Sequence, residues 1–327
     1  MKNYKSLTRV WLESQEKEDK LAIDYLDKFY FDNIIVPYKA SDKIIDLHTH
    51  TNYSDGDLSP SELIKLAIEK RVGTLAITDH DTLDGIKKID RSDSLIIDSG
   101  IQIINGIELS AKNSKGRMYI LGYDIDINDT NLNRRMEELK DNSINSVLSI
   151  MEQLKRDYDI VFRYNDIKEL VNSKHNLGRI DLAKLCVKYE YASSIQDAFD
   201  KYLIEAYNKT RSISKSLSYE ECIELILQSG GIPILAHPKS LELSEKEFLI
   251  LLKEMINIGL NGIEVYHSSH TEEEMKFYLE IANRYNLLIS GGSDYHGTSV
   301  KPDIELGTGR NNNLKIKSLS LINNINK

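Results

Sequence analysis

The sequence is poor in cysteine and has no long hydrophobic run, and both absences narrow the class of protein. It contains two cysteines, Cys186 and Cys222, among 327 residues. So few thiols give no disulfide framework, which fits a reducing compartment such as the cytoplasm. No apolar stretch approaches the roughly 18 residues of a membrane-spanning helix, and no signal peptide is visible at the start. The sequence therefore predicts a cytoplasmic protein with no membrane partner.

Positive charge is also scarce. The chain has 42 lysines and arginines against 51 aspartates and glutamates, which gives a net charge of -9. This balance argues against a broad basic surface for duplex DNA, but it leaves room for a local basic pocket that binds a small phosphorylated substrate. With 41% hydrophobic and 28% charged residues, the composition is otherwise that of an ordinary globular protein, and it indicates no particular oligomeric state.

Strand-like and helix-like segments alternate from residue 44 onward, which is typical of an α/β fold. Seven strands with short connections predict a largely parallel sheet, closed or nearly closed into a barrel. Only about ten residues separate the third strand from the fourth, too few for a crossover helix, so a distortion is expected there. The predicted strands are Lys43–His50, Thr74–His80, Ile101–Glu108, Met118–Tyr123, Ile232–His237, Gly262–His267 and Leu287–Asp294.

Other parts of the chain depart from this pattern. Residues 1–43 carry apolar side chains at helical spacing and predict a helical extension. The barrel is predicted in two parts, 44–127 and 216–327, separated by residues 128–215. That middle segment shows only helical periodicity, so it predicts a small all-α domain inserted into the barrel. Residues 305–327 are compatible with either a closing strand or a terminal helix.

Histidines are concentrated at the ends of the predicted strands. Of the eight histidines, seven lie at or just beyond such an end, and only His175 lies elsewhere. In α/β barrels the carboxyl ends of the strands form the active-site face. Carboxylates accompany the histidines there, and Asp79 and Asp81 flank His80 where they could orient an imidazole or cap a helix. The potential ligands at these strand ends are His48, His50, Asp55, His80, Glu108, His237, Asp294 and His296.

These side chains predict a metal centre. Alternation along the first strand points His48 and His50 to the same face, and Asp55 follows in a turn; the alternative is a half-buried strand that merely carries two histidines. Imidazoles and carboxylates without thiolates suit Mn²⁺, Fe²⁺ or Zn²⁺ and disfavour a structural zinc site. Eight potential ligands are too many for one ion, so two or three ions are expected. The predicted chemistry is hydrolysis by metal-activated water, with a phosphate ester favoured over an amide or C–N bond.

Five motifs taken in order resemble the PHP (polymerase and histidinol phosphatase) superfamily. They are HTHTNYSDG, ITDHDTLDG, GIELS, LAHP and GSDYHG, and the similarity also includes GIEVYHSSHT and KPDIELG. The order of the motifs and the helical insertion are most similar to stand-alone phosphoesterases that act on nucleotides or trim RNA from the 5′ end. The resemblance implies a distorted seven-stranded (β/α) barrel with the metal ions at its mouth.

The resemblance also implies a role for each ligand. One ion would be held by His48, His50, Glu108 and Asp294, and a second by Asp55, His80 and His296. Glu108 would bridge to a further ion held with His237. Two positions depart from the family pattern. Tyr119 stands where the fourth strand usually has a histidine, and Asp181 stands where the insertion usually has one in a GRPH-like motif. Because a phenol is a poor ligand near neutral pH, the bridged ion is expected to bind weakly, or to use water or Asp181.

Three further residues are candidates for contact with the substrate. Arg179 could hold a phosphate through its bidentate guanidinium, and Lys239 could do the same, although each could equally be a solvated side chain. His267 lies just past the sixth strand and is a candidate for binding or for proton donation to the leaving group, alongside Asp55 and His80 as catalytic residues.

The sequence therefore predicts a metal-dependent phosphoesterase that acts on a phosphate monoester of a small nucleotide or on the end of a short RNA. A histidinol-phosphate-type phosphatase is an alternative within enzymes. A second alternative is a non-catalytic module that keeps the fold and binds metal or nucleotide, which Tyr119 and Asp181 keep open.

Overall fold

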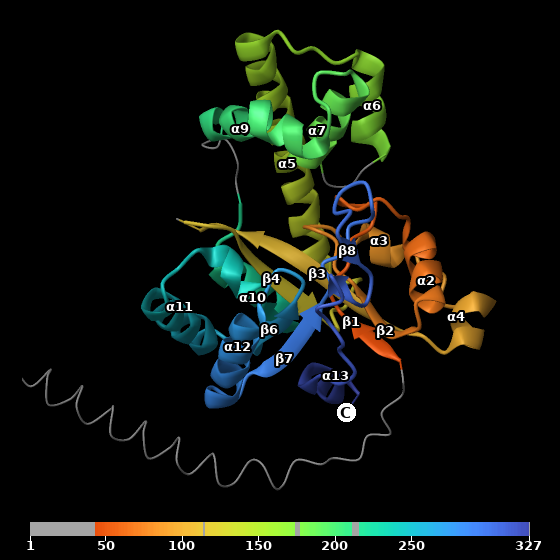
Figure 1. Ribbon diagram of the computed structural model, residues 1–327, viewed down its shortest axis with the longest axis vertical. Helices are drawn as coiled ribbons and strands as arrows, with labels where there is room; N and C mark the ends of the chain where they lie inside the picture. Colours follow the sequence, from red (N-terminus) through yellow and green to blue (C-terminus); the bar gives the residue numbers. More distant parts are fainter. Residues whose placement is uncertain (1–42, 114, 174–176, 211–215, 327) are drawn as a thin grey trace, which may run out of the picture. The chain divides into compact units, whose positions relative to one another are not determined.

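The computed structural model describes residues 43–113, 115–173, 177–210 and 216–326. Seven strands form one sheet in the order of the sequence (Figure 1). They are β1 (Ile44–Asp46), β2 (Val72–Ile77), β3 (Gln102–Ala111), β4 (Met118–Tyr123), β5 (Ile232–Leu235), β6 (Gly262–His267) and β7 (Leu288–Gly292). Backbone hydrogen bonds then link the segment after β1 to β7, from Leu47 N–H to Gly291 O and from Asp294 N–H to His48 O. The predicted nearly closed α/β barrel is confirmed.

The direction of β4 is the distortion in this barrel. It runs antiparallel to both β3 and β5, whereas the other neighbouring strands are parallel. The segment between Ala111 and Met118 is too short for a crossover and makes a hairpin instead. The chain therefore leaves β4 at Tyr123, beside Ile232 at the start of β5, and so at the end of the sheet opposite the predicted ligands.

Helices with well-defined N-caps cover the outside of the barrel (Figure 1). Ser59, Ser244 and Thr271 each begin a capping box, in which the side chain accepts a backbone N–H and a glutamate returns the bond. Helix α2 packs on β2, α10 on β4 and β5, and α12 on β6. The helices outside the inserted segment are α2 (Pro60–Glu69), α3 (Asp84–Lys87), α4 (Ser94–Ser99), α10 (Tyr219–Gln228), α11 (Glu245–Asn257), α12 (Glu272–Arg284), α13 (Ser320–Ile325) and the 3-10 helix η3 (Pro238–Leu241).

Helices alone make up the described part of the inserted segment. They are α5 (Thr130–Tyr158), α6 (Tyr164–Ser173), α7 (Arg179–Lys188), α8 (Ile195–Ala198), the π-helix η1 (Phe199–Leu203) and α9 (Ile204–Thr210). The 29 residues of α5 contribute to two cores. Leu132 and Met136 pack in the barrel core, whereas Val147 and Leu154 pack with α7 and α9 in a separate cluster. A helix of this length, about 44 Å at 1.5 Å per residue, can bring the chain from the end of the barrel where β4 ends back toward the end where the predicted ligands lie.

The C-terminal part of the chain covers the end of the barrel that lies opposite the predicted ligands. A short hairpin, β8 (Ile304–Glu305) and β9 (Gly309–Arg310), precedes an irregular segment and α13. Ile316 O accepts the N–H of Ile45 at the start of β1, and Leu314, Ile316 and Leu321 pack with Leu47 and other inward residues of the strands. A closing strand and a terminal helix were both compatible with the sequence of residues 305–327, and the terminal helix is present as α13.

Several sequence predictions fall on parts of the chain with few or no described residues. The predicted helical extension and His175 lie outside the described residues, apart from Lys43. The division of the chain into barrel and inserted domain at 128 and 215 stays a prediction, although the helices of the insertion have a hydrophobic cluster of their own. Within the described ranges, no helix is long and apolar enough to cross a membrane.

Candidate metal centre

The strand ends bring the predicted ligands to one place at the mouth of the barrel. Glu108 lies within β3, Asp55 lies in the longer loop after β1, and the other ligands follow β1, β2, β5 and β7 by a few residues. Most are withdrawn from solvent: His48 is 0% exposed, His50 and Glu108 are 1%, and Asp294 is 8%. So many ionisable groups are rarely buried together unless they pair with one another or bind metal.

Glu108 stands at the centre of the first group of ligand atoms. Its Oε2 lies 3.1 Å from His48 Nε2 and 3.2 Å from His50 Nε2. Its other oxygen, Oε1, lies 3.0 Å from His237 Nε2. The carboxylate therefore faces different imidazoles with its two oxygens, which is the arrangement that a bridging ligand requires. Asp294 joins the same group, with Oδ1 at 3.3 Å from His50 Nε2.

Asp55 organises a second group, made up with His50, His80 and His296. Asp55 Oδ1 lies 3.2 Å from His296 Nε2, and Oδ2 lies 3.8 Å from His80 Nε2. One ligand atom from each of the four residues can be chosen so that all lie within 4.8 Å of one another. The two groups share His50, so two ions bound there would be close neighbours.

The protonation of these groups is set by their mutual proximity. Burial alone would raise the pKa of Glu108, but the imidazoles of His80 and His48 hold it well below its usual range. Burial would lower the pKa of His50, but the carboxylates of Asp294 and Glu108 raise it to about 9. The carboxylates thus stay ionised, and without metal the His50 imidazole takes up a proton that a divalent ion would displace.

Buried nitrogens and oxygens without hydrogen-bond partners support the same conclusion. Among the described residues, both ring nitrogens of His50 and Oδ1 of Asp55 are buried and make no hydrogen bond. Orphaned buried polar atoms are costly, and a metal ion at this position would satisfy them. The donor set contains imidazole and carboxylate and no thiolate, so the residues present fit Mn²⁺, Fe²⁺ or Zn²⁺.

Two residues next to the ligands were not identified from the sequence. Glu264 in β6 lies 2.9 Å from His48 Nδ1, and Lys301 Nζ donates a 2.6 Å hydrogen bond to Asp294 Oδ2. Both belong to segments quoted for the family resemblance, GIEVYHSSHT and KPDIELG. A carboxylate inside an apolar run was the available signal for Glu264.

The three predicted substrate contacts are placed differently from one another. His267 is 4% exposed, its Nδ1 accepts the N–H of Ser269, and its Nε2 lies 3.4 Å from Asp294 Oδ2. Arg179 lies on α7, with Cζ 4.2 Å from the ring centroid of Tyr207. Lys239 is engaged elsewhere: it donates to Ser269 O and to a carboxylate oxygen of Glu274 at the start of α12. Only His267 is directly beside the predicted ligands.

The two departures from the family pattern also have defined surroundings. Tyr119 lies between two predicted ligands, with its ring centroid 5.1 Å from that of His80 and 5.4 Å from that of His237. Burial, followed by the charge of Glu108, raises the pKa of its phenol, so the phenol stays protonated. Asp181 is 1% exposed and accepts the N–H of Gly178 at the start of α7. It therefore acts as a helix cap in this structure.

Asp79 and Asp81 accept hydrogen bonds from the loops and strands around the ligands. Asp79 accepts the Thr51 N–H and the hydroxyls of Thr51 and Ser54, which shapes the loop before Asp55. Asp81 accepts the N–H of Ser110 at 2.8 Å. Both carboxylates thus fix the loops that carry the ligands, and the role of one of them in orienting an imidazole stays a prediction.

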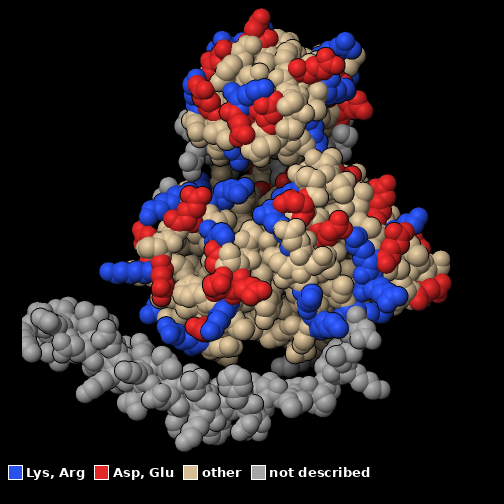
Figure 2. All heavy atoms as spheres, in the orientation of Figure 1, with Lys and Arg blue, Asp and Glu red and all other residues tan. Residues whose placement is uncertain are grey.

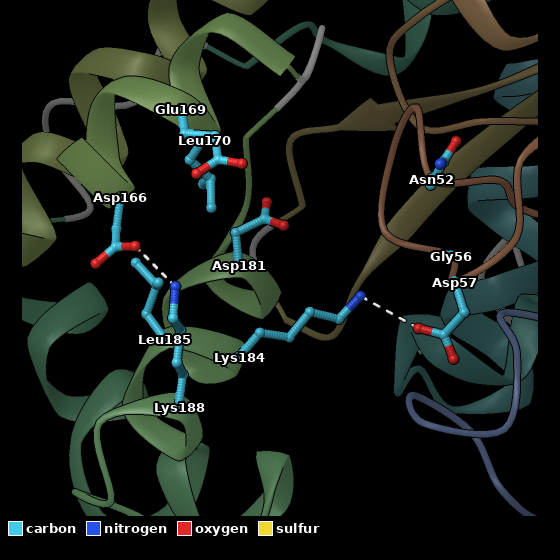
Figure 3. A pocket seen from close by; sticks show the side chains of 10 residues that line it. All are labelled: Asn52, Gly56, Asp57, Asp166, Glu169, Leu170, Asp181, Lys184, Leu185 and Lys188. Atoms are coloured by element: carbon cyan, nitrogen blue, oxygen red, sulfur yellow. Dashed lines mark hydrogen bonds and ion pairs between the residues drawn. The ribbon is translucent and has the colours of Figure 1, made fainter.

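A cavity of about 360 Å³ adjoins the loop that carries Asp55 (Figure 3). Figure 3 shows Lys184 reaching from α7 toward Asp57, where Nζ and Oδ1 are 3.3 Å apart, and Lys188 paired with Asp166. Asn52 and Gly56 line the barrel wall of the cavity, and Leu170 and Leu185 add apolar surface from the insertion. The cavity lies against the segment that also supplies a predicted metal ligand.

Comparison with known proteins agrees with this geometry. The PHP domain family matches residues 46–228. The chain is 32% identical to the 5′-3′ exoribonuclease Rnm of Escherichia coli K12, over 81% of this chain and 88% of that protein. It is 27% identical to the 3′,5′-nucleoside bisphosphate phosphatase of Chromobacterium violaceum, over 77% of this chain and 87% of that protein.

Solved structures show the same likeness. A Bifidobacterium adolescentis protein provisionally assigned as a metal-dependent phosphoesterase superposes with a TM-score of 0.69 at 26% identity, covering 82% of this chain and 92% of the other. Together with the strand-end cluster of histidines and carboxylates, this defines the protein as a metal-dependent phosphoesterase. The chain belongs to the PHP domain family.

Proposed function

We propose that this phosphoesterase acts on nucleotides, either as small free phosphate esters or at the end of a short RNA. The observation that carries the proposal is the convergence of ligand atoms on Glu108 and Asp55, beside an open cavity. Relatives with about the same chain length are named as an exoribonuclease and as a nucleoside bisphosphate phosphatase. The shared element of those substrates is a phosphoester on a nucleoside.

Two or three divalent ions are proposed, drawn from Mn²⁺, Fe²⁺ and Zn²⁺. His48, His50, Glu108 and Asp294 would hold one, and Asp55, His80 and His296 would hold another. Glu108 and His237 would contribute to a third, where Tyr119 supplies a protonated phenol in place of an imidazole. Ions bound in this way would activate a water molecule and stabilise charge on the phosphoryl oxygens.

The remaining residues are assigned to substrate handling. The N–H of Ser269 occupies Nδ1 of His267, so the neutral imidazole carries its proton on Nε2 and faces the cluster as a donor. It can donate that hydrogen bond to a phosphoryl or leaving-group oxygen. Arg179, whose guanidinium lies over the ring of Tyr207, is proposed to bind phosphate through its planar fork. Lys239 is the weakest of these assignments because Glu274 already neutralises it.

The cavity is proposed to receive the nucleoside. Its volume lies at the lower end of the roughly 300–1,000 Å³ of ligand pockets. Its lysines are paired with carboxylates, so the lining favours an uncharged group with hydrogen-bond donors over a second phosphate. On the face shown in Figure 2, basic and acidic side chains are intermingled, in keeping with the proposed absence of duplex DNA binding. A cytoplasmic location is likewise proposed, on the low cysteine content.

The test is hydrolysis of a substrate panel with added Mn²⁺. The panel contains adenosine 3′,5′-bisphosphate, mononucleotides, 5′-phosphorylated short RNAs, a ribosyl 1,2-cyclic phosphate and histidinol phosphate. We expect phosphate release or end trimming on a nucleotide substrate, and loss of that turnover in both His50→Ala and Asp294→Ala. Highest efficiency on histidinol phosphate would overturn the nucleotide assignment. Absence of turnover on every substrate, in protein that binds metal, would favour the non-catalytic alternative.

A further inference from the structure

Glu264 is a buried carboxylate that contacts the metal centre through two other residues. It lies in the middle of β6 and is 0% exposed. Its Oε1 is 2.9 Å from His48 Nδ1, and its Oε2 accepts a 2.8 Å hydrogen bond from the backbone N–H of His237. Because a buried carboxylate is costly unless its oxygens are bonded, these two partners account for its presence in the interior.

The bond to His48 determines which ring nitrogen can bind metal. A neutral imidazole has one N–H and one lone pair. When Nδ1–H donates to Glu264, the lone pair is on Nε2, which lies 3.1 Å from Glu108 Oε2 and faces the shared ligand group. A carboxylate behind a ligating imidazole fixes its tautomer and its ring orientation in this way.

The bond to His237 acts on the other side of Glu108. His237 is the N-cap residue just before η3 and lies two residues after the end of β5, where the regular strand has ended. The Glu264 carboxylate holds its backbone N–H, Ser240 Oγ lies 2.9 Å from its Nδ1, and its Nε2 lies 3.0 Å from Glu108 Oε1. Glu264 therefore supports the two imidazoles that face the two oxygens of Glu108.

The position of Glu264 depends on an irregularity in β6. Strict alternation would place Glu264 and His267 on opposite faces of the strand. The pairing register between β6 and β7 shifts between Glu264 and Tyr266, and ligand atoms of His48, Glu264 and His267 then lie within 4.8 Å of one another. Two roles are compatible with that proximity, a metal ligand or a support for ligands. The hydrogen bonds to His48 and to His237 favour the support, because they occupy both oxygens.

We propose that Glu264 is a positioning residue that sets the tautomer of His48 and the backbone position of His237, so that both imidazoles are oriented before the ions arrive. This inference rests on the proposed metal centre and is independent of the identity of the substrate. Glu264 touches neither substrate nor ions in this role, and its effect reaches the reaction through the affinity and geometry of the centre.

The experiment compares Glu264→Gln with the natural protein by Zn²⁺ titration against a chromophoric chelator. We expect a dissociation constant about 10–100-fold higher, as is typical when the partner of a ligating histidine is removed, with the same number of ions at saturation. In Zn²⁺-loaded protein labelled with ¹⁵N-histidine, the natural chain should show a strongly deshielded His48 Nδ1–H signal. That signal should move upfield in the variant, a change that a merely structural role would not produce.

Asp46→Asn is the matched control. Asp46 is also 0% exposed and accepts from Ser293, from Gly307 N–H and from the backbone of His48, so it reaches no imidazole. Unchanged affinity in Glu264→Gln, or the same upfield move of the His48 Nδ1–H signal in Asp46→Asn, would overturn the proposal. One ion fewer at saturation would also overturn it and make Glu264 a ligand. If Glu264→Gln does not fold, Glu264→Asp, which keeps the charge but cannot span both partners, decides the question by the same titration. None of these readouts uses a substrate, so a wrong nucleotide assignment would not alter them.

Discussion

The metal cluster and the insertion wall of the cavity are built in different ways. In the cluster, His48, His50 and Glu108 are almost completely buried and come from strand ends of one hydrogen-bonded sheet. On the insertion wall, the side chains of Lys184 and Lys188 are 31% and 60% exposed and pair with single carboxylates. Several neighbours therefore fix the position of each side chain in the cluster, whereas a single carboxylate holds each lysine of the wall.

From this difference in burial and pairing we expect the two regions to have different roles. A change in the cluster leaves a buried charge without its partner, and that costs several kcal/mol. A change on the insertion wall alters a single, partly exposed pair that contributes about 1 kcal/mol. The barrel should therefore fix the reaction, while the insertion adjusts which substrate is presented to it. Four predictions test this contrast, from the largest expected effect to the smallest.

Glu108→Gln should have the largest effect. The amide cannot supply two anionic oxygens to the imidazoles on either side, so we expect kcat/KM to fall at least about 10³-fold, equivalent to about 4 kcal/mol of transition-state stabilisation. Steady-state kinetics on the best nucleotide of the panel measures it. Glu280→Gln on the exposed face of α12 is the control and should match the natural protein. A fall of less than tenfold in Glu108→Gln would contradict the central role of Glu108.

His270 should make the buried region sensitive to acid. It is 3% exposed, its Nδ1–H donates to Val265 O, and burial followed by the neighbouring His267 lowers its pKa to about 4 from 6.5. Between those pH values the unfolded state binds more protons than the folded state. The free energy of unfolding should therefore fall as pH falls through this window, by about 2–3 kcal/mol from this residue. Urea unfolding at pH 7 and pH 4.5 measures the loss.

The variant His270→Gln supplies the comparison for that measurement. It retains an N–H donor for Val265 O but has no group that titrates, so its loss of stability between the two pH values should be smaller than that of the natural protein. Equal losses in both proteins would show that His270 is protonated in the folded state, and would contradict its low pKa.

Tyr119→His should strengthen the bridged site. An imidazole at this position would lie between His80 and His237 and add a ligand to a site that now has only Glu108 and His237. At equal free Mn²⁺ we expect about one more bound ion per chain than in the natural protein. Elemental analysis after gel filtration counts the ions. Tyr119→Phe removes the hydroxyl without adding a ligand and should leave the count unchanged. A count of three in all proteins would refute a weakened site.

Lys184→Met should have the smallest effect. The substitution removes the half-buried pair with Asp57 and leaves the apolar stem, so the free energy of unfolding should change by about 1 kcal/mol. KM for a nucleotide should change by less than about tenfold, with kcat retained. Lys201→Met, which breaks the exposed pair with Asp197 elsewhere in the insertion, is the control. A large fall in kcat would show that the insertion wall takes part in the reaction.

Much of the barrel and most of the cluster could be predicted because their signals are local. An apolar run that ends in histidine or carboxylate predicts both a strand and the placement of its last side chains. The seven predicted strands are present, and the residues that follow them, such as His48 and Asp294, converge as expected. The short link before β4 also indicated the distortion, because nine residues cannot cross a sheet and return in parallel.

The remaining features depend on contacts between distant segments. The role of Glu264 follows from a shifted register in β6 and from a partner, His48, in the segment after β1, neither of which leaves a pattern in the sequence. Lys239 looks free in the sequence, but it pairs with Glu274 at the start of α12, beyond α11 and β6 along the chain. For Glu264 and Lys239 a tertiary contact therefore decides between the possible roles. Asp181, which stands where the family pattern has a histidine, is different, because a local hydrogen bond makes it the cap of its own helix.

The barrel can close only late in synthesis, because the segment that ends in α13 is needed to close it. Ile316 O bonds to Ile45 at the beginning of β1, and Leu314 and Leu321 pack inside the barrel. Ribosomes make this segment after all seven strands, so Ile45, which already pairs with β2 on one side, lacks its hydrogen bond to Ile316 on the other side until translation has passed Ile316. The incomplete barrel would expose Leu47 and its apolar neighbours during that interval. At this stage the chain is most prone to aggregation, and chaperone binding would protect it most.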